Sequence, residues 1–408
     1  MTARLHRLAN GLAVAVEPMA GVETVSVGLY ADVGARSEPA GLSGLAHMVE
    51  HMVFKGAGGR SARAIAETIE DRGGQLNAWT ARDQTVFQAR LLADDLALGT
   101  AIIADLVRAP HFDEEELARE KQVVLSELGE ARDTPDDIIF DHLQGAAFAG
   151  PLGLPVLGDE GSIAAIDTDA LHRWTAGQYR PGGLVLCAAG KVDEDALLAL
   201  AERLFGDMAP GAPPAFAPAG FGGGTHHDRR RFDQLHVALA FPGVGHLHAD
   251  LHALALYAAA VGGGMSSRLF QQVREERGLA YSIYSWTHSY ADTGLFGIYC
   301  AAARGDAAHA LALTRAVLAE TAESLTGDEL DRARAQAKAG LLMGLESVAG
   351  RADHLARQIQ IHGRIVLPAE TVAQLDAVTL AQVRAAAASA LAGGEALATV
   401  GGRLAKAA

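Results

Sequence analysis

Two histidines and a glutamate lie within five residues of one another in the segment GLSGLAHMVEHMVFKG, which spans residues 41–56. His47 and His51 are four residues apart, so on a helix they share one face, one turn apart, and Glu50 lies beside that face. Two neutral imidazoles at this spacing can bind one zinc ion, and the carboxylate can take a proton from a zinc-bound water. The alternative is a helix with satisfied core histidines, but H-x-x-E-H is the inverted form of the H-E-x-x-H zinc helix.

A catalytic zinc site needs a third protein ligand and must keep a fourth position open. The segment EEELAREKQVVLSELGEARD carries Glu120 and Glu127, which are seven residues apart and would project from nearly one face of a helix. Glu127 lies 76 positions after His51, among apolar residues where a carboxylate is costly unless it is paired or bound to a metal. Spacing alone also allows Glu127 to be an exposed, solvated charge.

The elements that would position these residues repeat along the chain. Alternating, strand-like patterns at 24–34 and 234–245 are each followed by an apolar, helix-like run. Two further echoes follow in the same order: EDRGGQLNAWTARD with EERGLAYSIYSWTHS, and FDEEELAREKQVVLSEL with TGDELDRARAQAKAGLL. Any two α+β domains share coarse patterns, but three echoes in one order favour a duplication. We therefore expect an α+β fold of two duplicated domains, each a mainly antiparallel sheet with long helices packed on one face.

A Gly- and Pro-rich stretch, GDMAPGAPPAFAPAGFGGGT, separates the two halves. It lacks the apolar periodicity of a packed element, which is typical of an interdomain linker. We therefore expect an N-terminal domain at 1–207, a linker at 208–229 and a C-terminal domain at 230–408.

The second half lacks an equivalent set of zinc ligands. When the halves are aligned through their echoes, His51 falls opposite Leu256 and Glu127 falls opposite Gly340. Neither leucine nor glycine has a side chain that binds a metal. The metal is therefore expected in the N-terminal domain alone.

The composition is that of an ordinary globular protein. The chain has 408 residues, of which 50% are hydrophobic and 20% charged, and a formal net charge of -15. This acidic balance argues against nucleic-acid or anionic-membrane partners and allows a basic substrate. No apolar run approaches the roughly 20 residues of a membrane helix, and the N-terminus lacks the apolar core of a signal peptide, so a cytoplasmic location is expected. Cys187 and Cys300 each lie in an apolar run and are expected to be buried thiols.

The segments HMVEHMVFKG, GGQLNAWTARDQTVF and EKQVVLSEL together resemble the pitrilysin-type zinc peptidases, or inverzincins. The nearest resemblance is to the bacterial relatives of the mitochondrial processing peptidase, and it covers nearly all of the chain. It implies that His47, His51 and Glu127 bind one zinc ion per chain and that Glu50 is the general base. It also implies that Glu120 accepts the other N–H of a ligand histidine and thereby holds that ring in place.

Two further segments resemble parts of the same family. NAWT is similar to the family's edge strand, whose backbone at Asn77 and Ala78 would pair with an extended substrate, although Asn77 could instead be a turn residue. The segment GGGMSSRLFQQVREERGLAYSIYSW resembles the C-terminal signature, in which Arg274 and Tyr281 would hold the substrate carbonyl and stabilise the oxyanion. Taken alone, Arg274 would be a solvated charge and Tyr281 an interface or core aromatic.

The function expected from this resemblance is that of a zinc-dependent endopeptidase acting on peptides or unfolded polypeptide segments. In this family four domains enclose the metal, so a two-domain chain implies a homodimer, or a heterodimer with a homologous subunit. Arg274 and Tyr281 of one subunit would then face the zinc of the other. The alternative is a non-catalytic structural or partner subunit, against which the presence of all six site residues argues. A zinc-dependent binding protein is a third possibility, but it would need no general base.

Overall fold

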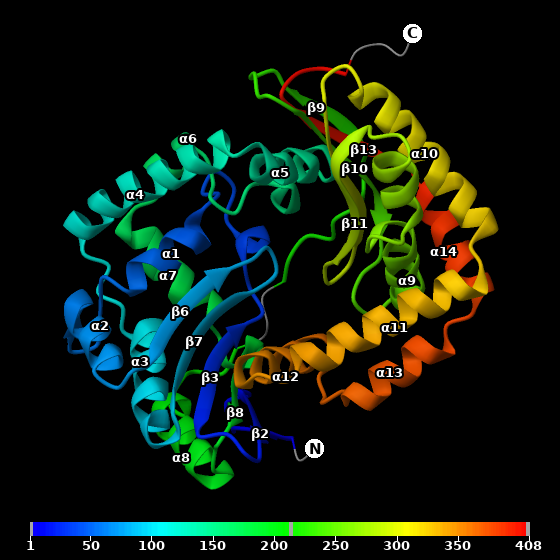
Figure 1. Cartoon of the computed structure of the whole chain (residues 1–408). Helices are drawn as coiled ribbons and strands as arrows, with labels where there is room; N and C mark the ends of the chain where they lie inside the picture. The colour runs from blue at the N-terminus through cyan, green and yellow to red at the C-terminus, as the bar shows by residue number, and fades with distance from the viewer. Residues whose placement is uncertain (1–2, 212–214, 405–408) are drawn as a thin grey trace. The chain divides into compact units, whose positions relative to one another are not determined.

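The computed structural model describes residues 3–211 and 215–404, and contacts along the chain divide it into two compact units (Figure 1). The first unit consists of Met1–Leu128, Leu154–Ala217 and Met343–Val366. The second unit consists of Gly129–Gly153, Pro218–Leu342 and Leu367–Ala408. Each unit has a sheet and a hydrophobic core of its own.

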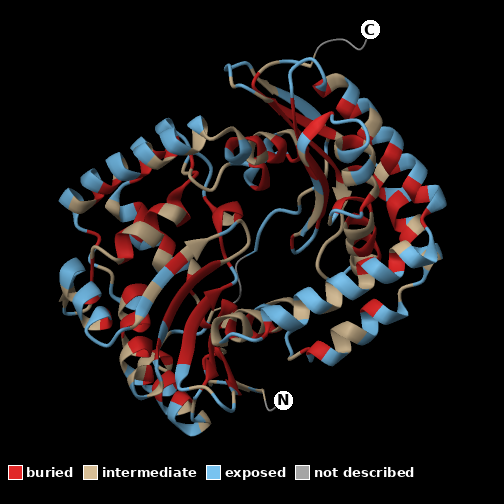
Figure 2. Ribbon diagram, viewed as in Figure 1, coloured by how far each residue is buried: buried red, intermediate tan, exposed pale blue. Residues whose placement is uncertain are grey.

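The sheet of the first unit has the strand order β1-β2-β8-β3-β7-β6. Its strands are β1 (Arg4–Arg7), β2 (Ala13–Pro18), β3 (Thr24–Ala31), β6 (Gln75–Thr80), β7 (Thr85–Leu92) and β8 (Leu184–Gly190). β2 and β8 run parallel, and the other neighbours run antiparallel. Strand β8, LVLCAAG, is buried at every position (Figure 2), which is the pattern of a strand covered on both faces.

Helices α3 (Leu96–Arg108) and α8 (Glu194–Phe205) pack on one face of this sheet. They share the larger core of the unit with α1 (Leu45–Val53), α7 (Thr168–Gln178) and the buried leucines and valine of α4 (Glu114–Asp133). The remaining elements are η1 (Ala35–Ser37), β4 (Gly56–Ala57), β5 (Arg60–Ser61), α2 (Ala62–Glu70), η2 (Ala93–Asp95), α6 (Glu160–Ala165) and η4 (Pro181–Gly183).

The opposite face of the first sheet is lined by small side chains, and α12 (Val348–His362) packs directly on it. Ala13, Ala15 and Cys187 meet Ala352 and its neighbours on α12, because small side chains let the helix approach the strands closely. Polar contacts also join α12 to this sheet: Arg351 binds Glu17 at 2.6 Å, and the Tyr30 hydroxyl donates to Asp353 at 2.5 Å.

The sheet of the second unit has the order β11-β12-β10-β13-β9, in which β13 and β9 are parallel and the other pairs antiparallel. Its strands are β9 (Gly224–Asp228), β10 (Leu235–Gly243), β11 (Ala280–Ser289), β12 (Gly294–Ala302) and β13 (Ala396–Val400). This order is that of β6-β7-β3-β8-β2 in the first unit, with the one parallel pair of each order in the same place. The predicted α+β fold of two duplicated, mainly antiparallel units is therefore confirmed.

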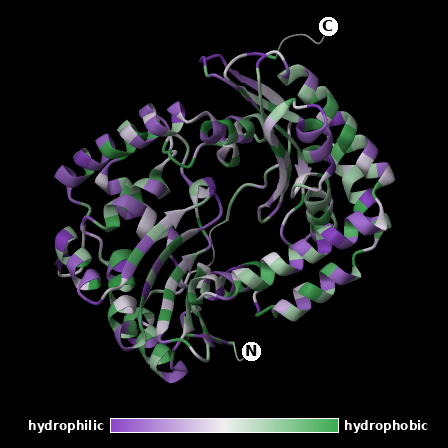
Figure 3. Cartoon of the chain, in the orientation of Figure 1, coloured by the Kyte–Doolittle hydropathy of each residue, from purple (hydrophilic) through white to green (hydrophobic). Residues whose placement is uncertain are grey.

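Helices α9 (Leu251–Gly262), α10 (Ala307–Ser324) and α14 (Leu380–Ala392) pack on one face of the second sheet. Helix α5 (Pro135–Ala147) packs on the other face, against alanines of β10, β12 and β13. The other elements are η3 (Pro151–Gly153), η5 (Phe270–Glu275), α11 (Gly327–Gly344) and α13 (Pro368–Ala377). Along α4 and α11, hydrophilic and hydrophobic segments alternate (Figure 3), as expected for helices with one buried stripe.

The two halves of the chain exchange one helix each. Helix α5 follows α4 in the N-terminal half but belongs to the second unit, and α12 follows α11 in the C-terminal half but belongs to the first. The boundaries predicted from the sequence, 1–207 and 230–408, follow chain order and so do not contain this exchange. When the chain is divided into two consecutive segments, each helix is assigned to the segment that contains it, whichever sheet its apolar face covers.

The last residues of the predicted linker, 208–229, include a strand. Gly224–Asp228 form β9, which pairs in parallel with β13. This edge strand is mostly exposed and is held by backbone hydrogen bonds, so its sequence, GTHHD, has no apolar alternation that would reveal it. Residues 212–214 of the predicted linker lie outside the described residues.

Both cysteines are free and buried, as predicted. Burial raises the pKa of Cys300 to about 12 and that of Cys187 well above its usual value, so both thiols stay protonated at neutral pH. Among the described helices, none combines the length and the apolar composition that crossing a membrane requires.

Candidate metal centre

Helix α1 is short, and most of it is buried. Its apolar side chains, among them Met48, Val49 and Met52, lie in the core of the first unit, and α7 and β6 pack against it. At 3.6 residues per turn, the remaining positions of the sequence LAHMVEHMV bring His47, Glu50 and His51 to one side. The tight packing of the apolar side therefore fixes the direction in which these three polar side chains point.

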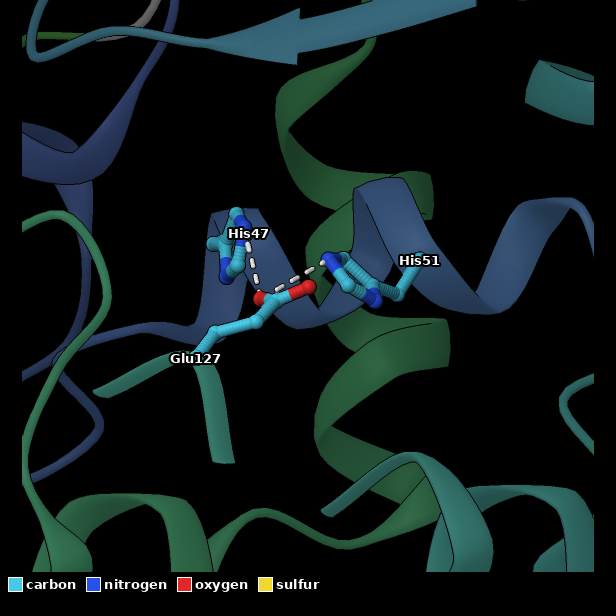
Figure 4. Close-up of side chains that lie close together, drawn as sticks. All are labelled: His47, His51 and Glu127. Atoms are coloured by element: carbon cyan, nitrogen blue, oxygen red, sulfur yellow. Dashed lines mark ion pairs between the residues drawn. The ribbon is translucent and has the colours of Figure 1, made fainter. Parts of the chain in front are cut away.

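Glu127, near the end of α4, lies against the two histidines of α1 (Figure 4). Its Oε2 atom is 3.5 Å from His51 Nε2 and 4.0 Å from His47 Nε2. One donor atom from each of the three residues lies within 4.8 Å of the other two, and the imidazole rings meet edge to face with centroids 4.5 Å apart. The structure thus brings together all three residues that the sequence predicts as metal ligands.

The spacing of these donors suits a zinc ion. Zinc–ligand distances of about 2.0–2.2 Å in a tetrahedral site place neighbouring donors about 3.3–3.6 Å apart. The two measured separations from Glu127, 3.5 and 4.0 Å, differ from this by a few tenths of an ångström at most. The histidine side chains are 12% and 18% exposed and that of Glu127 is 40% exposed, so the group is reached from one side, where a fourth position can stay open. The residues present therefore fit the metal.

Glu120 contacts the far side of the His51 ring. Its Oε2 atom is 3.0 Å from His51 Nδ1, and its Oε1 atom accepts from Lys55 Nζ at 2.7 Å. The carboxylate is 6% exposed, and the ammonium group balances its charge where water cannot. With Nδ1 donating to Glu120, His51 has Nε2 free for a metal, which is the arrangement predicted for Glu120.

His47 is a neutral imidazole over the usual pH range. Burial, and then the neighbouring His51 ring, lower the pKa of His47 to about 4. Only the neutral ring can coordinate a metal through Nε2. His47 therefore needs no deprotonation before binding a metal at neutral pH.

Glu50, in α1, has one carboxylate oxygen, Oε2, that is buried and without a hydrogen-bond partner among the described residues. Burial raises the pKa of Glu50, an effect that Thr80 and His51 oppose and Glu127 reinforces. A carboxyl group whose pKa is raised above its usual value holds a proton more readily, which suits a group that must accept and return one. Burial, and to a smaller extent the charge of Glu50, also raise the pKa of the fully buried Tyr179.

Asn77 and Ala78 lie in β6, at one edge of the first sheet. They pair with Gln88 and Phe87 of β7 on one side only. Asn77 is therefore a strand residue rather than a turn residue, and the second edge of β6 carries backbone groups of the kind that an added strand can use. Binding of a substrate there stays a prediction.

Arg274 and Tyr281 belong to the second unit. Arg274, in η5, lies with its guanidinium carbon 4.6 Å from the centre of the Phe270 ring and 5.8 Å from the centre of the Tyr281 ring. Tyr281, in β11, is 74% exposed, so its hydroxyl can reach a ligand. The structure thus brings Arg274 and Tyr281 together within their unit, and their joint action with the metal ligands stays a prediction.

In the part of the second unit that the structure describes, the metal ligands have no counterpart. Among the described residues, the one group of three side chains spaced for a metal is His47, His51 and Glu127. His252, which the sequence aligns with His47, is half-buried at the start of α9, with Nε2 3.1 Å from the Gln374 side-chain oxygen.

Two residues around the centre were not predicted from the sequence. Lys55 lies four positions after His51, so helical spacing could have placed it near the same carboxylate. Thr80 is three positions after Asn77 in β6, and no pattern in the sequence connects it to Glu50. Both reach the site through the packing of α1 against α4 and β6.

The duplicated α+β fold, with two histidines of α1 and a glutamate of α4 close together, places the chain in the class of zinc-protease-like proteins. Residues 13–160 match the family described as Insulinase (Peptidase family M16), and residues 165–337 match the Peptidase M16 inactive domain. The chain is 36% identical to an uncharacterized zinc protease of Rickettsia bellii over 90% of this chain and 89% of that protein. It is 33% identical to an uncharacterized zinc protease of Bacillus subtilis over 92% of each. The chain belongs to peptidase family M16.

Two solved structures share this fold. A protease from Helicobacter pylori superposes with a TM-score of 0.89 at 21% identity, covering 97% of this chain and 99% of that one. A peptidase M16 inactive domain from Pseudomonas fluorescens superposes with a TM-score of 0.91 at 24% identity, covering 100% and 99%. At these identities the two likenesses show the fold alone.

Replacement of Lys55 by Met should weaken zinc binding by about tenfold, because Glu120 would lose the charge that fixes it beside His51. The matched control is Lys121→Met, which removes the same charge one residue beyond Glu120 from a side chain that donates to the Ala164 carbonyl. Zinc affinity can be measured by competition with a chromophoric chelator. Equal affinities for the two variants would contradict a role for Lys55 at the metal centre.

The metal-free protein should become less stable as the pH is lowered, because of His47. The pKa of His47 is lowered from 6.5 to about 4, so between these values the unfolded chain binds a proton that the native protein does not. The free energy of unfolding from this group should therefore decrease as pH falls from 7 to 4.5, by about 2 kcal/mol. Urea unfolding of wild type and His47→Gln with a chelator present measures the difference, and parallel pH dependences would contradict it.

Proposed function

We propose that this protein is a zinc-dependent endopeptidase that hydrolyses peptides or unfolded polypeptide segments. The observation that carries the proposal is that His47, His51 and Glu127 converge with their donor atoms within 4.8 Å of one another, while Glu50 lies on the same helix. Two imidazoles and one carboxylate are the ligand set of catalytic zinc in peptidases. The relatives named zinc proteases support the same class of chemistry.

Zinc, when bound, supplies a Lewis acid next to the scissile bond. Glu50 accepts the proton of the attacking water and passes it to the leaving amine, so one carboxylate acts first as base and then as acid. Its raised pKa suits both steps, because the proton is held strongly enough to be taken and weakly enough to be returned. Glu120 and Lys55 keep the His51 ring oriented throughout.

The substrate would bind as an extended strand along the free edge of β6. Main-chain hydrogen bonds at Asn77 and Ala78 hold a peptide without reading its side chains, which suits an enzyme for unfolded segments. Arg274 and Tyr281 would donate to the substrate carbonyl and stabilise the charge that develops on its oxygen. The net charge of -15 allows basic peptides among the substrates.

A dimer would complete the active centre. We propose a homodimer, or a heterodimer with a homologous subunit, in which Arg274 and Tyr281 of one subunit act with the metal ligands of the other. In this arrangement the metal centre and the oxyanion-binding pair of every chain would both be used. A cytoplasmic location completes the proposal and rests on the sequence alone.

The second candidate function is that of a non-catalytic subunit of a peptidase-like complex. It is favoured by one observation: the family that residues 165–337 match is described as an inactive domain. That match covers a half of the chain in which no metal ligands are expected, whereas the complete ligand set lies in the other half. The peptidase proposal therefore accounts for more of the site.

Replacement of Glu50 by Gln should lower kcat for a quenched, basic, unstructured peptide by a factor of about 100 to 10,000. The amide keeps the size of the carboxyl but cannot accept a proton. Wild type and variant are compared side by side with zinc present. A matched control is Glu70→Gln, which makes the same change at an exposed position of α2.

The bound metal must be measured in the same samples. Undiminished zinc in Glu50→Gln assigns the loss to proton transfer rather than to the site. Equal cleavage by wild type and variant would overturn the role of Glu50. Cleavage by neither, with zinc bound in both, would favour the non-catalytic subunit.

Mixed dimers test whether the two halves act between subunits. One parent carries Glu50→Gln, and the other carries Arg274→Ala with Tyr281→Phe; each is expected to be nearly inactive by itself. If the pair acts in trans, a mixed dimer has one centre with both defects and one with none. An isolated mixed dimer should therefore have about half of wild-type activity.

The mixed dimers are formed by co-expression with two different affinity tags and isolated through both tags. No recovery in such dimers would show that Arg274 and Tyr281 act within their own subunit, whereas full activity of the Arg274→Ala/Tyr281→Phe parent would show that they have no catalytic part. Full activity of a monomer in gel filtration would overturn the dimer.

A further inference from the structure

The first turn of α1 has no capping side chain of its own. The residue before the helix is Gly44, whose φ of 90° and ψ of 1° are left-handed rather than the extended values of an ordinary N-cap. A Cβ atom at this position would lie 2.7 Å from the Leu157 carbonyl oxygen, so no serine or aspartate fits there. The N–H groups that begin α1 therefore need an acceptor from elsewhere in the chain.

Glu38 supplies that acceptor from six residues upstream. Its Oε2 atom accepts from Gly44 N–H at 2.9 Å, and its Oε1 atom accepts from Ala46 N–H at 2.8 Å. Glu38 is 8% exposed, so these bonds are shielded from water. Ala46 directly precedes His47, which places the capping bond next to the first predicted ligand.

The segment that carries Glu38 is itself fixed by contacts with other parts of the first unit. Glu38 directly follows η1, whose backbone is bonded to the chain at Ala81 and Arg82. The side chain of Arg36, in η1, is buried, contacts Asp83 at 3.2 Å and lies over the Phe216 ring at 4.0 Å. Glu38 thus connects α1 to a fixed part of the first unit rather than to a free loop.

We propose that Glu38 is the positioning residue of the metal centre. Its carboxylate holds the first turn of α1 and thereby keeps His47 and His51 at the separation from Glu127 that a metal requires. This inference rests on the proposed function, since it concerns the same centre. Glu38 touches neither substrate nor metal and acts only through the helix.

Both oxygens of Glu38 accept an N–H bond, and the positive end of the helix dipole lies beside them. These features favour the ionised carboxylate, whereas burial raises the pKa of Glu38 to about 8. In either form the group offers more accepting capacity than an amide, whose nitrogen cannot accept. A graded pair of substitutions therefore separates partial from complete loss of the cap.

The test compares zinc binding by Glu38→Ala, Glu38→Gln and wild type through chelator competition, with the visible spectrum of bound Co²⁺ as a second readout. We expect zinc affinity about tenfold lower in the Ala variant, an intermediate loss in the Gln variant and an altered Co²⁺ spectrum. The matched control is Glu17→Ala. Glu17 is 7% exposed in the same unit, but it bonds to Arg351 on α12 instead of to α1.

The control separates positioning from general stability. Loss of stability in both variants with loss of zinc affinity in Glu38→Ala alone supports the proposal. Wild-type affinity and spectrum in folded Glu38→Ala would overturn it, as would an equal loss in Glu17→Ala. If the Ala variant does not fold, the Gln variant decides: weaker binding supports the proposal and unchanged binding overturns it.

Hydrogen exchange distinguishes failure of this inference from failure of the proposed function. Faster exchange of amides in 44–53 is expected in metal-free Glu38→Ala relative to Glu17→Ala. If wild type binds no zinc, the proposed function fails, but this comparison still tests the cap. Unchanged exchange in 44–53 would overturn it.

Discussion

The burial of carboxylates around helix α1 is the constraint on which the metal centre depends. A carboxylate taken out of water is strongly destabilising unless hydrogen bonds or opposite charges replace its hydration. Glu38 is stabilised by two backbone N–H groups and Glu120 by Lys55 and His51. Each of these contacts forms only when α1 has a particular position in the unit and a particular rotation about its own axis. The polar groups therefore specify the position of the helix, while its apolar side provides the driving force for burying it.

The exchange of helices between the two halves makes the units depend on a continuous chain. Each sheet is covered on its second face by a helix coded in the other half, α12 in the first unit and α5 in the second. The alanines on those faces would be exposed if either half folded alone, and an open apolar face of this kind favours association. The duplication thus produced two similar sheets that cannot be separated by one cut in the sequence. The strand order is the same in both units although a helix has been exchanged. This is consistent with the apolar face of each sheet, rather than chain order, determining which helix packs on it.

Much of the fold and of the centre could be predicted from the sequence, because both rest on local periodicity. The i, i+4 spacing of His47 and His51 fixes a common face on any helix, and alternation identifies buried strands such as β3 and β10. The exchange of α5 and α12 has no local signal, because an amphipathic helix does not record which sheet it covers. Strand β9 was missed because an exposed edge strand needs only backbone bonds. Its place beside β13 follows from the duplication, since β2 lies beside β8 in the first unit.

Residues that support the site were harder to predict than residues that form it. Ligands must be of particular types, so their types and spacing are informative. Glu38 acts through backbone N–H groups six and eight residues away, where a carboxylate is needed only because Gly44 can carry no capping side chain. That need arises from the close approach of Leu157, a contact between segments far apart in the chain. Long-range packing therefore creates the requirement, and no local pattern contains it.

The charges at the centre are a further argument for the kind of ligand it binds. Glu50, Glu120 and Glu127 lie around the histidines, and Lys55 contacts Glu120. Three carboxyl groups thus face one lysine in a partly buried site, so acidic side chains outnumber basic ones there. A divalent cation between Glu127 and the histidines would offset the charge of Glu127, whose repulsion adds to the larger effect of burial in raising the pKa of Glu50. The site is thus built for a dication electrostatically as well as by ligand type, and a neutral ligand would leave the repulsion in place.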